Sequence, residues 1–248
     1  MNYIVGDIGN TSTRVCLMNE KSKIIESTIF DTNRIFHKGF IKKVFKKLFK
    51  KKAKKEILFS SVVPIAFRKI KYIFRNSNYK VFEIKRYNLK KLIKMNIKNI
   101  NQLGSDRIVN SIEGKKFKNC LIIDFGTATT FDVIKNETYE GGAIAPGVKL
   151  SIKTLSQSTA LLPVFNLKNK KITYGKNTKD ALNAGFFLGY EGLINNIVNK
   201  ITLKWKMRYK IILTGGYANF FKKIIKKRSI IDQDITIKGI SKVYKFFV

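Results

Sequence analysis

One pattern occurs twice in this chain of 248 residues: an apolar strand, the triplet Asp-x-Gly, a run of hydroxyl residues and a second apolar strand. The first copy spans residues 4–15 and the second spans residues 122–133. Two apolar runs joined by a tight glycine turn are typical of a β-hairpin. Two copies of one hairpin predict two related domains, at residues 1–115 and 116–248, with the closing strand or helix free to pack back on the first domain.

The segments around the hairpins alternate between strand and helix. Short apolar runs predict further strands at residues 57–63, 80–84 and 211–214. Helices are predicted to begin near Ile65 and to cover residues 108–113, 148–156, 178–200 and 218–227. This alternation is typical of an α/β fold.

The two hairpin turns carry the groups that phosphate binding requires. A glycine lies two residues after each aspartate, at Gly9 and Gly126, where the missing Cβ lets the backbone approach a ligand. The amides and hydroxyls that follow can surround anionic oxygens. The aspartates, Asp7 and Asp124, supply the hard oxygen that Mg²⁺ prefers. Asp-x-Gly turns are often only structural, so it is the pair of turns that predicts a phosphate clamp.

Two glycine-containing segments are candidates for further parts of a nucleotide site. Thr214-Gly215-Gly216 lies between a predicted strand and a predicted helix, where a flat ring can rest on the backbone, although small residues there also serve ordinary packing. Residues 140–147 are predicted to form a loop whose free amides meet an anion, or a simple turn.

The catalytic candidate lies between the hairpins, where Gly104-Ser105 precedes Asp106 and Arg107. The sequence places Asp106 near the first turn of a helix, so its carboxylate either stabilises the helix start or accepts a proton from a substrate hydroxyl. In the second interpretation, Arg107 holds an anionic group of the substrate or the incoming phosphate.

The charge of the chain needs its own explanation. Lys+Arg 50 against Asp+Glu 16 gives a formal net charge of +34, which in general favours nucleic acid or an anionic surface. The excess is nearly all lysine, which is the poorer bidentate partner of phosphates and bases. The densest block, residues 42–52, spaces its apolar residues as an amphipathic helix with a solvated basic face does. Nucleic-acid binding is therefore not the favoured interpretation.

Several other chemistries are excluded by composition. The single histidine, His37, has no catalytic neighbours in sequence, so carboxylates, hydroxyls and amides must carry any catalysis. Cys16 and Cys120 each lie in an apolar run, as small buried side chains of a reducing compartment do. No apolar run approaches the roughly 18 residues of a spanning helix, and the amino terminus lacks a basic region before an apolar one. A cytoplasmic protein without a membrane partner is expected.

Together these motifs resemble the type III pantothenate kinases of the acetate and sugar kinase, Hsc70 and actin superfamily. The matching segments are residues 7–11, 60–64, 104–107, 124–129, 141–147, 214–216 and 235–240. Each is ordinary alone, but the whole series in this order is specific. The resemblance implies two related ribonuclease H-like domains of the actin-like ATPase superfamily with a nucleotide cleft between them. It also implies phosphorylation of pantothenate by ATP at the terminal hydroxyl, the first step towards coenzyme A.

Roles for individual residues follow from the resemblance. The ATP phosphate loop would consist of Asp7, Ile8, Gly9, Asn10, Thr11, Ser12, Thr13 and Arg14, with Asp7 near Mg²⁺. Thr127 matches a further ATP contact, and Asp124 matches the ligand of a monovalent cation, K⁺ or NH₄⁺. Pantothenate would contact Gly104, Ser105, Asp106 and Arg107, with Asp106 as the general base. Thr178 matches a pantothenate contact that the partner subunit supplies, which implies a homodimer.

Two positions depart from the family pattern. The family usually carries a Tyr-x-x-Pro arrangement that lines the substrate site ahead of Gly-x-Asp-Arg, whereas Ile97 and Ile100 stand at those positions here. A phenol contact to the substrate is therefore missing, and weaker affinity for pantothenate is expected.

Two alternatives to a pantothenate kinase stay open at this point. One is a catalytically weak regulatory or nucleic-acid-binding relative that uses the basic surface, and the other is a kinase of the same superfamily that acts on a different small molecule. The intact set of Asp7, Asp106, Arg107 and Asp124 argues against a pure binding protein. The Gly-Ser-Asp-Arg segment argues against a different substrate.

Overall fold

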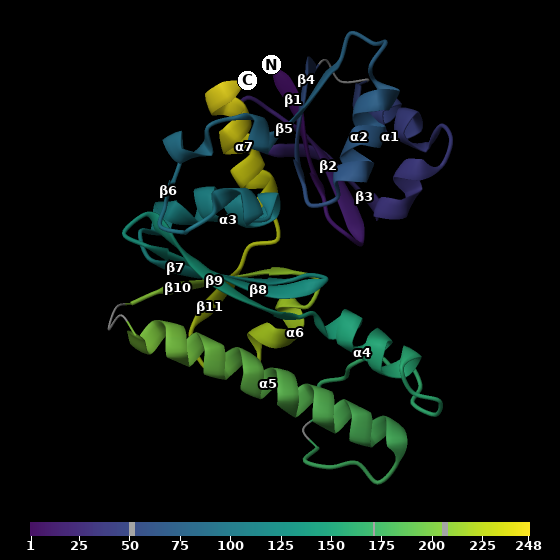
Figure 1. Ribbon diagram of the computed structural model, residues 1–248, viewed down its shortest axis with the longest axis vertical. Coiled ribbons are helices and arrows are strands. Elements are labelled where there is room, and N and C mark those ends of the chain that lie inside the picture. Colours follow the sequence, from purple (N-terminus) through teal and green to yellow (C-terminus); the bar gives the residue numbers. More distant parts are fainter. Residues whose placement is uncertain (50–52, 171, 205–207) are drawn as a thin grey trace. The chain divides into compact units, whose positions relative to one another are not determined.

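The computed structural model describes residues 1–49, 53–170, 172–204 and 208–248, and its ribbon is drawn in Figure 1. Internal contacts divide the chain into two units. Unit 1 comprises Met1–Lys116, Glu137–Tyr139 and Asp234–Val248. Unit 2 comprises Phe117–Asn136 and Glu140–Gln233. Each unit contains strands and helices of its own, and each is described separately below.

The sheet of unit 1 has the strand order β3-β2-β1-β4-β5. Its strands are β1 (Asn2–Ile8), β2 (Ser12–Met18), β3 (Ile24–Asp31), β4 (Ala53–Ser61) and β5 (Lys80–Glu83). The first three strands are antiparallel, whereas β4 is parallel to β1 and β5 is parallel to β4. The hairpin predicted at residues 4–15 is confirmed, with Asp7 opposite Arg14 in the register.

Helices cover both faces of this sheet. They are α1 (Phe40–Phe49), α2 (Pro64–Ile73), α3 (Ser105–Gly114) and α7 (Ile235–Phe247). Short 3₁₀ turns are η1 (Thr32–Phe36), η2 (Ile84–Arg86), η3 (Leu89–Lys91), η4 (Ile100–Gln102) and η5 (Lys115–Phe117). The short strand β6 (Lys94–Met95) pairs with residues 138 and 139.

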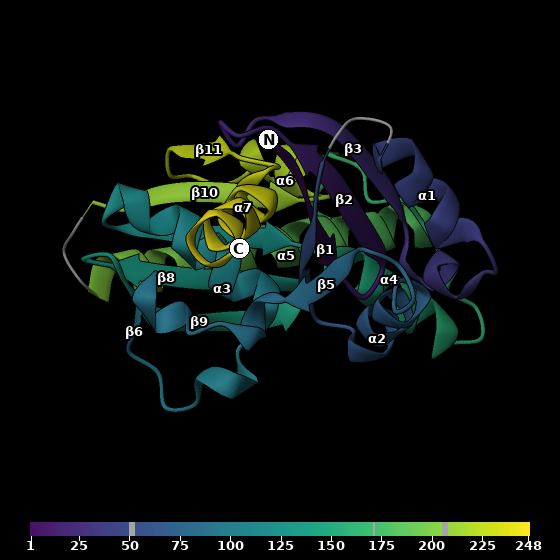
Figure 2. The same cartoon turned by 90° about the horizontal axis from the view of Figure 1, so that it is seen from above.

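The alternation of side chains along β1 produces two separate cores in unit 1. Ile4 packs with Phe45 and Phe59 in a core that includes α1 and α2. Val5 points to the other face, where it packs with residues of α3 and α7, including Ile112 and Ile240. Helices α3 and α7 lie side by side in both Figure 1 and Figure 2.

Unit 2 is built around the second hairpin, which confirms the prediction for residues 122–133. The strand order is β11-β10-β7-β8-β9, with β10 parallel to both β7 and β11. The strands are β7 (Cys120–Phe125), β8 (Ala128–Lys135), β9 (Thr138–Pro146), β10 (Lys210–Gly215) and β11 (Ser229–Ile231). The helices are α4 (Val148–Gln157), α5 (Thr178–Lys204) and α6 (Ala218–Lys222). Apolar residues of all three helices form one core with the sheet.

Two of the sequence predictions need correction, and a third lies partly outside the described residues. Residues 140–147 are not a loop, because all but the last lie in β9. The helix predicted at residues 218–227 ends at Lys222. The basic helix predicted at residues 42–52 begins at Phe40 and is described as far as Phe49, so its last three residues lie outside the described residues. Its apolar face is buried as predicted, with Val44, Phe45 and Leu48 inward.

The remaining composition-based expectations concern cysteines and membranes. Cys16 and Cys120 are free and buried, as their apolar surroundings in the sequence predict. Burial raises the pKa of the Cys120 thiol to about 12, so this thiol stays protonated at neutral pH. No helix within the described ranges has both the length and the apolar character to cross a bilayer.

Candidate nucleotide and substrate site

The turn of the first hairpin in unit 1 is held in shape by a neighbouring threonine. The Gly9 N–H donates to Ser12 O at 3.0 Å, which closes the turn. The Thr32 hydroxyl donates to Gly9 O at 2.6 Å, and the Thr32 N–H donates to Thr11 O at 3.0 Å. These hydrogen bonds hold the turn in shape from within the protein.

The residues of this predicted phosphate loop fall into two groups. Asn10, Thr11 and Ser12 are exposed at the tip of the turn. Ile8 and Thr13 are fully buried, and the Thr13 hydroxyl bonds to the Thr32 hydroxyl at 3.0 Å. Side-chain contacts to a ligand are therefore available from the tip, whereas Ile8 and Thr13 form the framework beneath it.

Arg14 has partners within the protein. Its Nη1 lies 2.7 Å from Asp234 Oδ1, and its Nε donates to Ser27 Oγ at 3.0 Å. Asp234 is the residue immediately before α7, so this ion pair connects the first hairpin to the start of the last helix. The sequence motifs predict Arg14 in the phosphate loop but do not indicate this partner.

The second predicted segment of unit 1, residues 104–107, forms the N-terminus of α3. Ser105 is buried, and its hydroxyl donates to Glu83 Oε1 at 2.8 Å. The other oxygen of Glu83 accepts the Lys85 N–H at 2.7 Å. Glu83 therefore fixes the start of α3 against the end of β5.

Glu83 is absent from the site that the sequence motifs predict, although the sequence contains a signal for it. It is the single acidic residue between Glu56 and Asp106, in a stretch rich in lysine. A lone carboxylate at a strand end in such a segment indicates a specific hydrogen-bonding role.

The carboxylate of Asp106 folds back over the start of its own helix. Its Oδ1 accepts the Arg107 N–H at 2.8 Å. A Cβ added to Gly104 would come within 2.5 Å of the same oxygen. Burial raises the pKa of the Asp106 carboxyl above its usual range, and the Arg107 N–H and the charges of Arg107 and Lys85 partly oppose that shift. A carboxylate with a raised pKa next to a helix N-terminus can act as a general base.

In unit 2, three glycine-containing segments meet at the turn of the second hairpin. The Gly126 N–H donates to Ala128 O at 3.1 Å and closes the turn. The Gly216 N–H donates to Phe125 O at 3.1 Å, and the Gly147 N–H donates to Thr127 O at 3.2 Å. The segments at residues 124–129, 141–147 and 214–216, which lie far apart in sequence, are thus joined through backbone hydrogen bonds.

A Cβ at Gly147 would lie 2.2 Å from Thr127 O, inside the backbone of the turn. Gly215 has a φ of +83°, and a Cβ there would lie 2.5 Å from Asp124 Oδ1. Thr127 is exposed at this turn, and Asp124 is partly buried.

A cation in this region would have few side-chain ligands. Within the described ranges, no group of three or more His, Cys, Asp or Glu side chains could hold a metal ion. An ion near Asp124 would therefore be held by one carboxylate together with backbone carbonyls, which is chemistry that suits K⁺. An Mg²⁺ ion near Asp7 would be held by one carboxylate and by phosphate oxygens, a common arrangement for that ion.

Thr178 lies elsewhere in unit 2, in the first turn of α5. Asn177 and Asp180 exchange hydrogen bonds around it, since the Asp180 N–H donates to Asn177 Oδ1 at 3.0 Å and Asn177 Nδ2 donates to Asp180 Oδ2 at 2.9 Å. This reciprocal pair resembles a capping box and starts the helix. Thr178 is exposed on the edge of a groove of about 640 Å³ whose lining includes Leu155, Gly185, Phe186 and Gly189.

Comparison with known proteins identifies the family. A model described as type III pantothenate kinase matches residues 3–200, which include both hairpins and the Gly-Ser-Asp-Arg segment. A type III pantothenate kinase from Pelagibacter ubique is 48% identical over 239 residues, covering 96% of each chain. The chain belongs to the type III pantothenate kinase family. Another member, from Persephonella marina, is 33% identical over 256 residues and covers 97% of each chain.

Solved structures with the same fold are more distant in sequence. A conserved protein from Campylobacter jejuni, described as a candidate Baf family transcriptional activator, has a TM-score of 0.64 at 21% identity over 98% of both chains. The activator of the 2-hydroxyisocaproyl-CoA dehydratase from Clostridium difficile, solved with bound ADPNP, has a TM-score of 0.54 at 12% identity over 99% of this chain and 97% of that chain. These likenesses confirm the predicted α/β fold.

The close approach of the Asp106 carboxylate to Gly104 can be tested by adding a Cβ to this glycine. In the Gly104→Ala variant, the new methyl group must displace the Asp106 carboxylate, because the clash is with the end of that short side chain. We expect kcat to fall about tenfold or more, while the midpoint of thermal unfolding changes by only a few degrees. Steady-state kinetics and thermal unfolding measure the two effects.

The matched control is Gly192→Ala, since nothing lies within 4 Å of a Cβ built at Gly192. This control should leave kcat and the unfolding midpoint close to those of the unmodified protein. A Gly104→Ala protein with normal kcat would show that the position of the Asp106 carboxylate does not limit turnover.

Proposed function

We propose that this chain transfers the γ-phosphoryl group of ATP to the terminal hydroxyl of pantothenate, the first step towards coenzyme A. The observation that carries the proposal is the constellation at the start of α3, in a chain of the type III pantothenate kinase family. There the Asp106 carboxyl is partly buried and has a raised pKa. It lies directly before Arg107 in the sequence and close to Gly104. Such a carboxylate is suited to accept a proton from an alcohol.

Asp106 is the general base in this mechanism. As the pantothenate oxygen bonds to the γ-phosphorus, its proton passes to the Asp106 carboxylate. The bond from the γ-phosphorus to the β–γ bridging oxygen breaks, and ADP leaves with that oxygen. Arg107 is placed one residue further along α3, where its guanidinium can hold an anionic group of either reactant.

The hairpin turns bind the nucleotide in this proposal. The exposed tip at Asn10, Thr11 and Ser12 contributes donors for phosphate oxygens, and Thr127 contributes a further one. Asp7 would hold Mg²⁺ together with those phosphates, and Asp124 would hold K⁺ or NH₄⁺. When bound, these cations neutralise charge on the phosphates. The backbone around Gly215 and Gly216 offers a flat surface for the adenine end.

We further propose a homodimer that forms through the groove between α4 and α5. The groove is mainly apolar, and Thr178, whose family counterpart contacts pantothenate in the partner subunit, lies on its edge. A Cβ built at Gly185 or Gly189 would meet nothing within 4 Å, so another chain can approach α5 closely there. A second copy of this chain thus covers the groove, and Thr178 of each subunit contacts the pantothenate bound to the other subunit.

The alternatives receive no specific support. The basic face of α1 is what an amphipathic helix in a lysine-rich chain presents, and its apolar side is buried in the core. Family membership favours the kinase over a regulatory or nucleic-acid-binding relative and over a different substrate.

The first test of function replaces the base. Purified protein should release ADP from ATP only when pantothenate is present. The Asp106→Asn variant should lower kcat by about 10²–10⁴-fold, because its amide cannot accept the proton, with little change in the Kd for ATP. Coupled ADP release and nucleotide titration measure the two quantities. Turnover that persists in Asp106→Asn would remove this residue from the role of base.

A second test addresses the monovalent cation. We expect K⁺ or NH₄⁺ to stimulate the unmodified protein, and we expect Asp124→Asn to lose that stimulation because the neutral amide binds a cation weakly. Glu137→Gln, at an exposed position of the turn between β8 and β9, is the control and should keep that stimulation. Stimulation that survives in Asp124→Asn at the same cation concentration would contradict the assignment.

A third test addresses the dimer. Gly189→Arg places a long charged side chain in the groove, so we expect a monomer by light scattering and loss of most pantothenate-dependent turnover. Asn78→Arg, at an exposed position of unit 1, is the control and should remain dimeric. A Gly189→Arg protein that is still dimeric would place the subunit contact on another surface.

A further inference from the structure

A second cavity, of about 440 Å³, lies in unit 1 next to the Gly-Ser-Asp-Arg segment. Ile97 and Ile100, which stand where the family has tyrosine and proline, are both part of its lining. Ile108, two residues after Asp106, is part of it as well. The two substituted positions therefore face a real cavity beside the predicted substrate segment.

The cavity is polar and cationic. Its lining contains the lysines Lys85, Lys90 and Lys98 and the asparagines Asn88, Asn99 and Asn101, and no aspartate or glutamate is among its lining residues in the described part of the chain. A cavity with ammonium and amide groups and no carboxylate favours an anionic ligand group.

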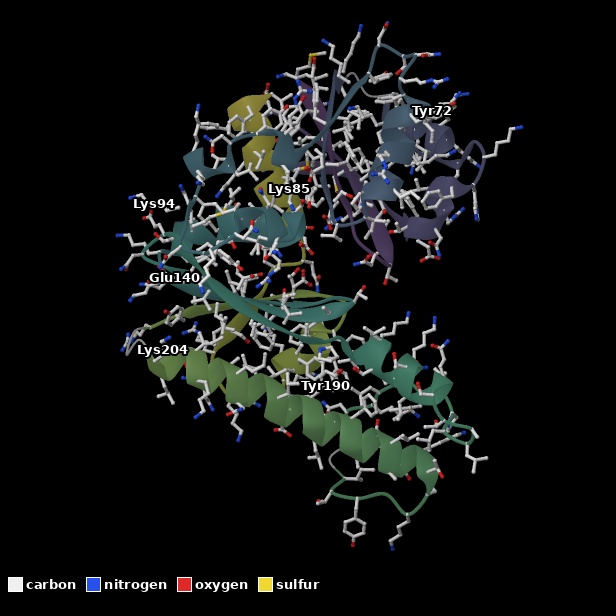
Figure 3. All side chains as sticks on the ribbon, viewed as in Figure 1. Tyr72, Lys85, Lys94, Glu140, Tyr190 and Lys204 are labelled. Carbon is white, nitrogen blue, oxygen red and sulfur yellow. The ribbon has the colours of Figure 1, made fainter. Side chains whose placement is uncertain are left out.

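Of the three lysines that line the cavity, Lys85 is the one whose hydrogen bonds the structure describes. Its Nζ donates to Asn101 O at 3.2 Å, and its backbone N–H donates to Glu83 Oε2 at 2.7 Å. Glu83 in turn accepts the hydroxyl of Ser105. Lys85 is thus connected to the start of α3 and to the residues just before it, through both its side chain and its backbone. Its side chain is labelled above α3 in Figure 3.

The positive charge of Lys85 affects the pKa of Asp106, the predicted base. It opposes the effect of burial on the pKa of the Asp106 carboxyl and does the same at Glu83. The ammonium group is therefore within electrostatic range of Asp106 without being bonded to it.

We propose that Lys85 binds the carboxylate of pantothenate in this cavity and supplies the polar contact that the phenol position, now Ile97, cannot make. The proposal rests on the proposed function. Pantothenate carries its carboxylate at the opposite end from the hydroxyl that is phosphorylated. A site that places this hydroxyl at Asp106 needs a cation some distance away, and Lys85 meets that need. Ile97 and Ile100 then pack against the carbon chain of the substrate.

The test compares pantothenate with pantothenol, a neutral analogue that has an alcohol in place of the carboxylate. For Lys85→Met we expect the KM for pantothenate to rise about tenfold or more, because a charge-assisted hydrogen bond is lost. The KM for pantothenol should change less than twofold. Lys85→Arg, which keeps the charge, should recover much of the discrimination between the two substrates.

The control is Lys71→Met, which removes an exposed lysine of α2 that is not part of the cavity lining and should leave both KM values close to those of the unmodified protein. Thermal unfolding of each variant checks that the fold is intact, which is expected because the Lys85 side chain is exposed.

The possible outcomes separate the two proposals. Equal rises in KM for both substrates in Lys85→Met, or no rise in either, would overturn the assignment of Lys85 and leave the kinase in place. An unmodified protein that phosphorylates neither compound would overturn the proposed function and this assignment with it.

Discussion

Close contact between backbones at glycine is the constraint on which both units depend. In unit 1 a Cβ at Gly239 would lie 2.0 Å from Val109 O, so α7 packs against α3 only because that atom is absent. In unit 2 the same is true of Gly147 against Thr127 O and of Gly215 against the backbone of Phe125. These contacts bring residues from distant parts of the chain to the hairpin turn and to the helix that carries Asp106. A methyl group at any of them would separate the elements, since packed interiors have little space to yield.

The second organising feature is the scarcity of carboxylates. The chain has only 16 acidic residues against 50 basic ones, and those that the structure describes in detail have specific partners. Asp234 pairs with Arg14 and so links the first hairpin to α7. The buried Glu113 pairs with Lys116 and with Lys242, the latter at 2.8 Å, and so links α3 to α7. Glu83 holds Ser105 at the start of α3. In a chain of this charge, a carboxylate in a defined position is more informative than another lysine.

These two features meet at the N-terminus of α3. Packing between α3 and α7 fixes the helix, Glu83 fixes its first residue, and the glycine before it leaves room for the Asp106 carboxylate. Burial then raises the pKa of that carboxyl, while the charges of Arg107 and Lys85 partly oppose the shift. A raised pKa makes the carboxylate a better proton acceptor, as a general base must be.

The sequence by itself determined the two hairpins, the α/β class and the family, because the repeated Asp-x-Gly pattern and the order of the motifs are local features. It also located Asp106 near a helix start. It did not reveal that residues 140–146 form a strand, because Gly141 and Gly142 suggest a loop. Of these glycines, Gly147, immediately after the strand, is the one in backbone contact with Thr127. Only the tertiary structure decided that Glu83 holds Ser105, that Arg14 pairs with Asp234 and that Lys85 shares a cavity with Ile97. Each of these pairs joins residues from separate elements, and their proximity depends on how strands and helices pack rather than on any local pattern.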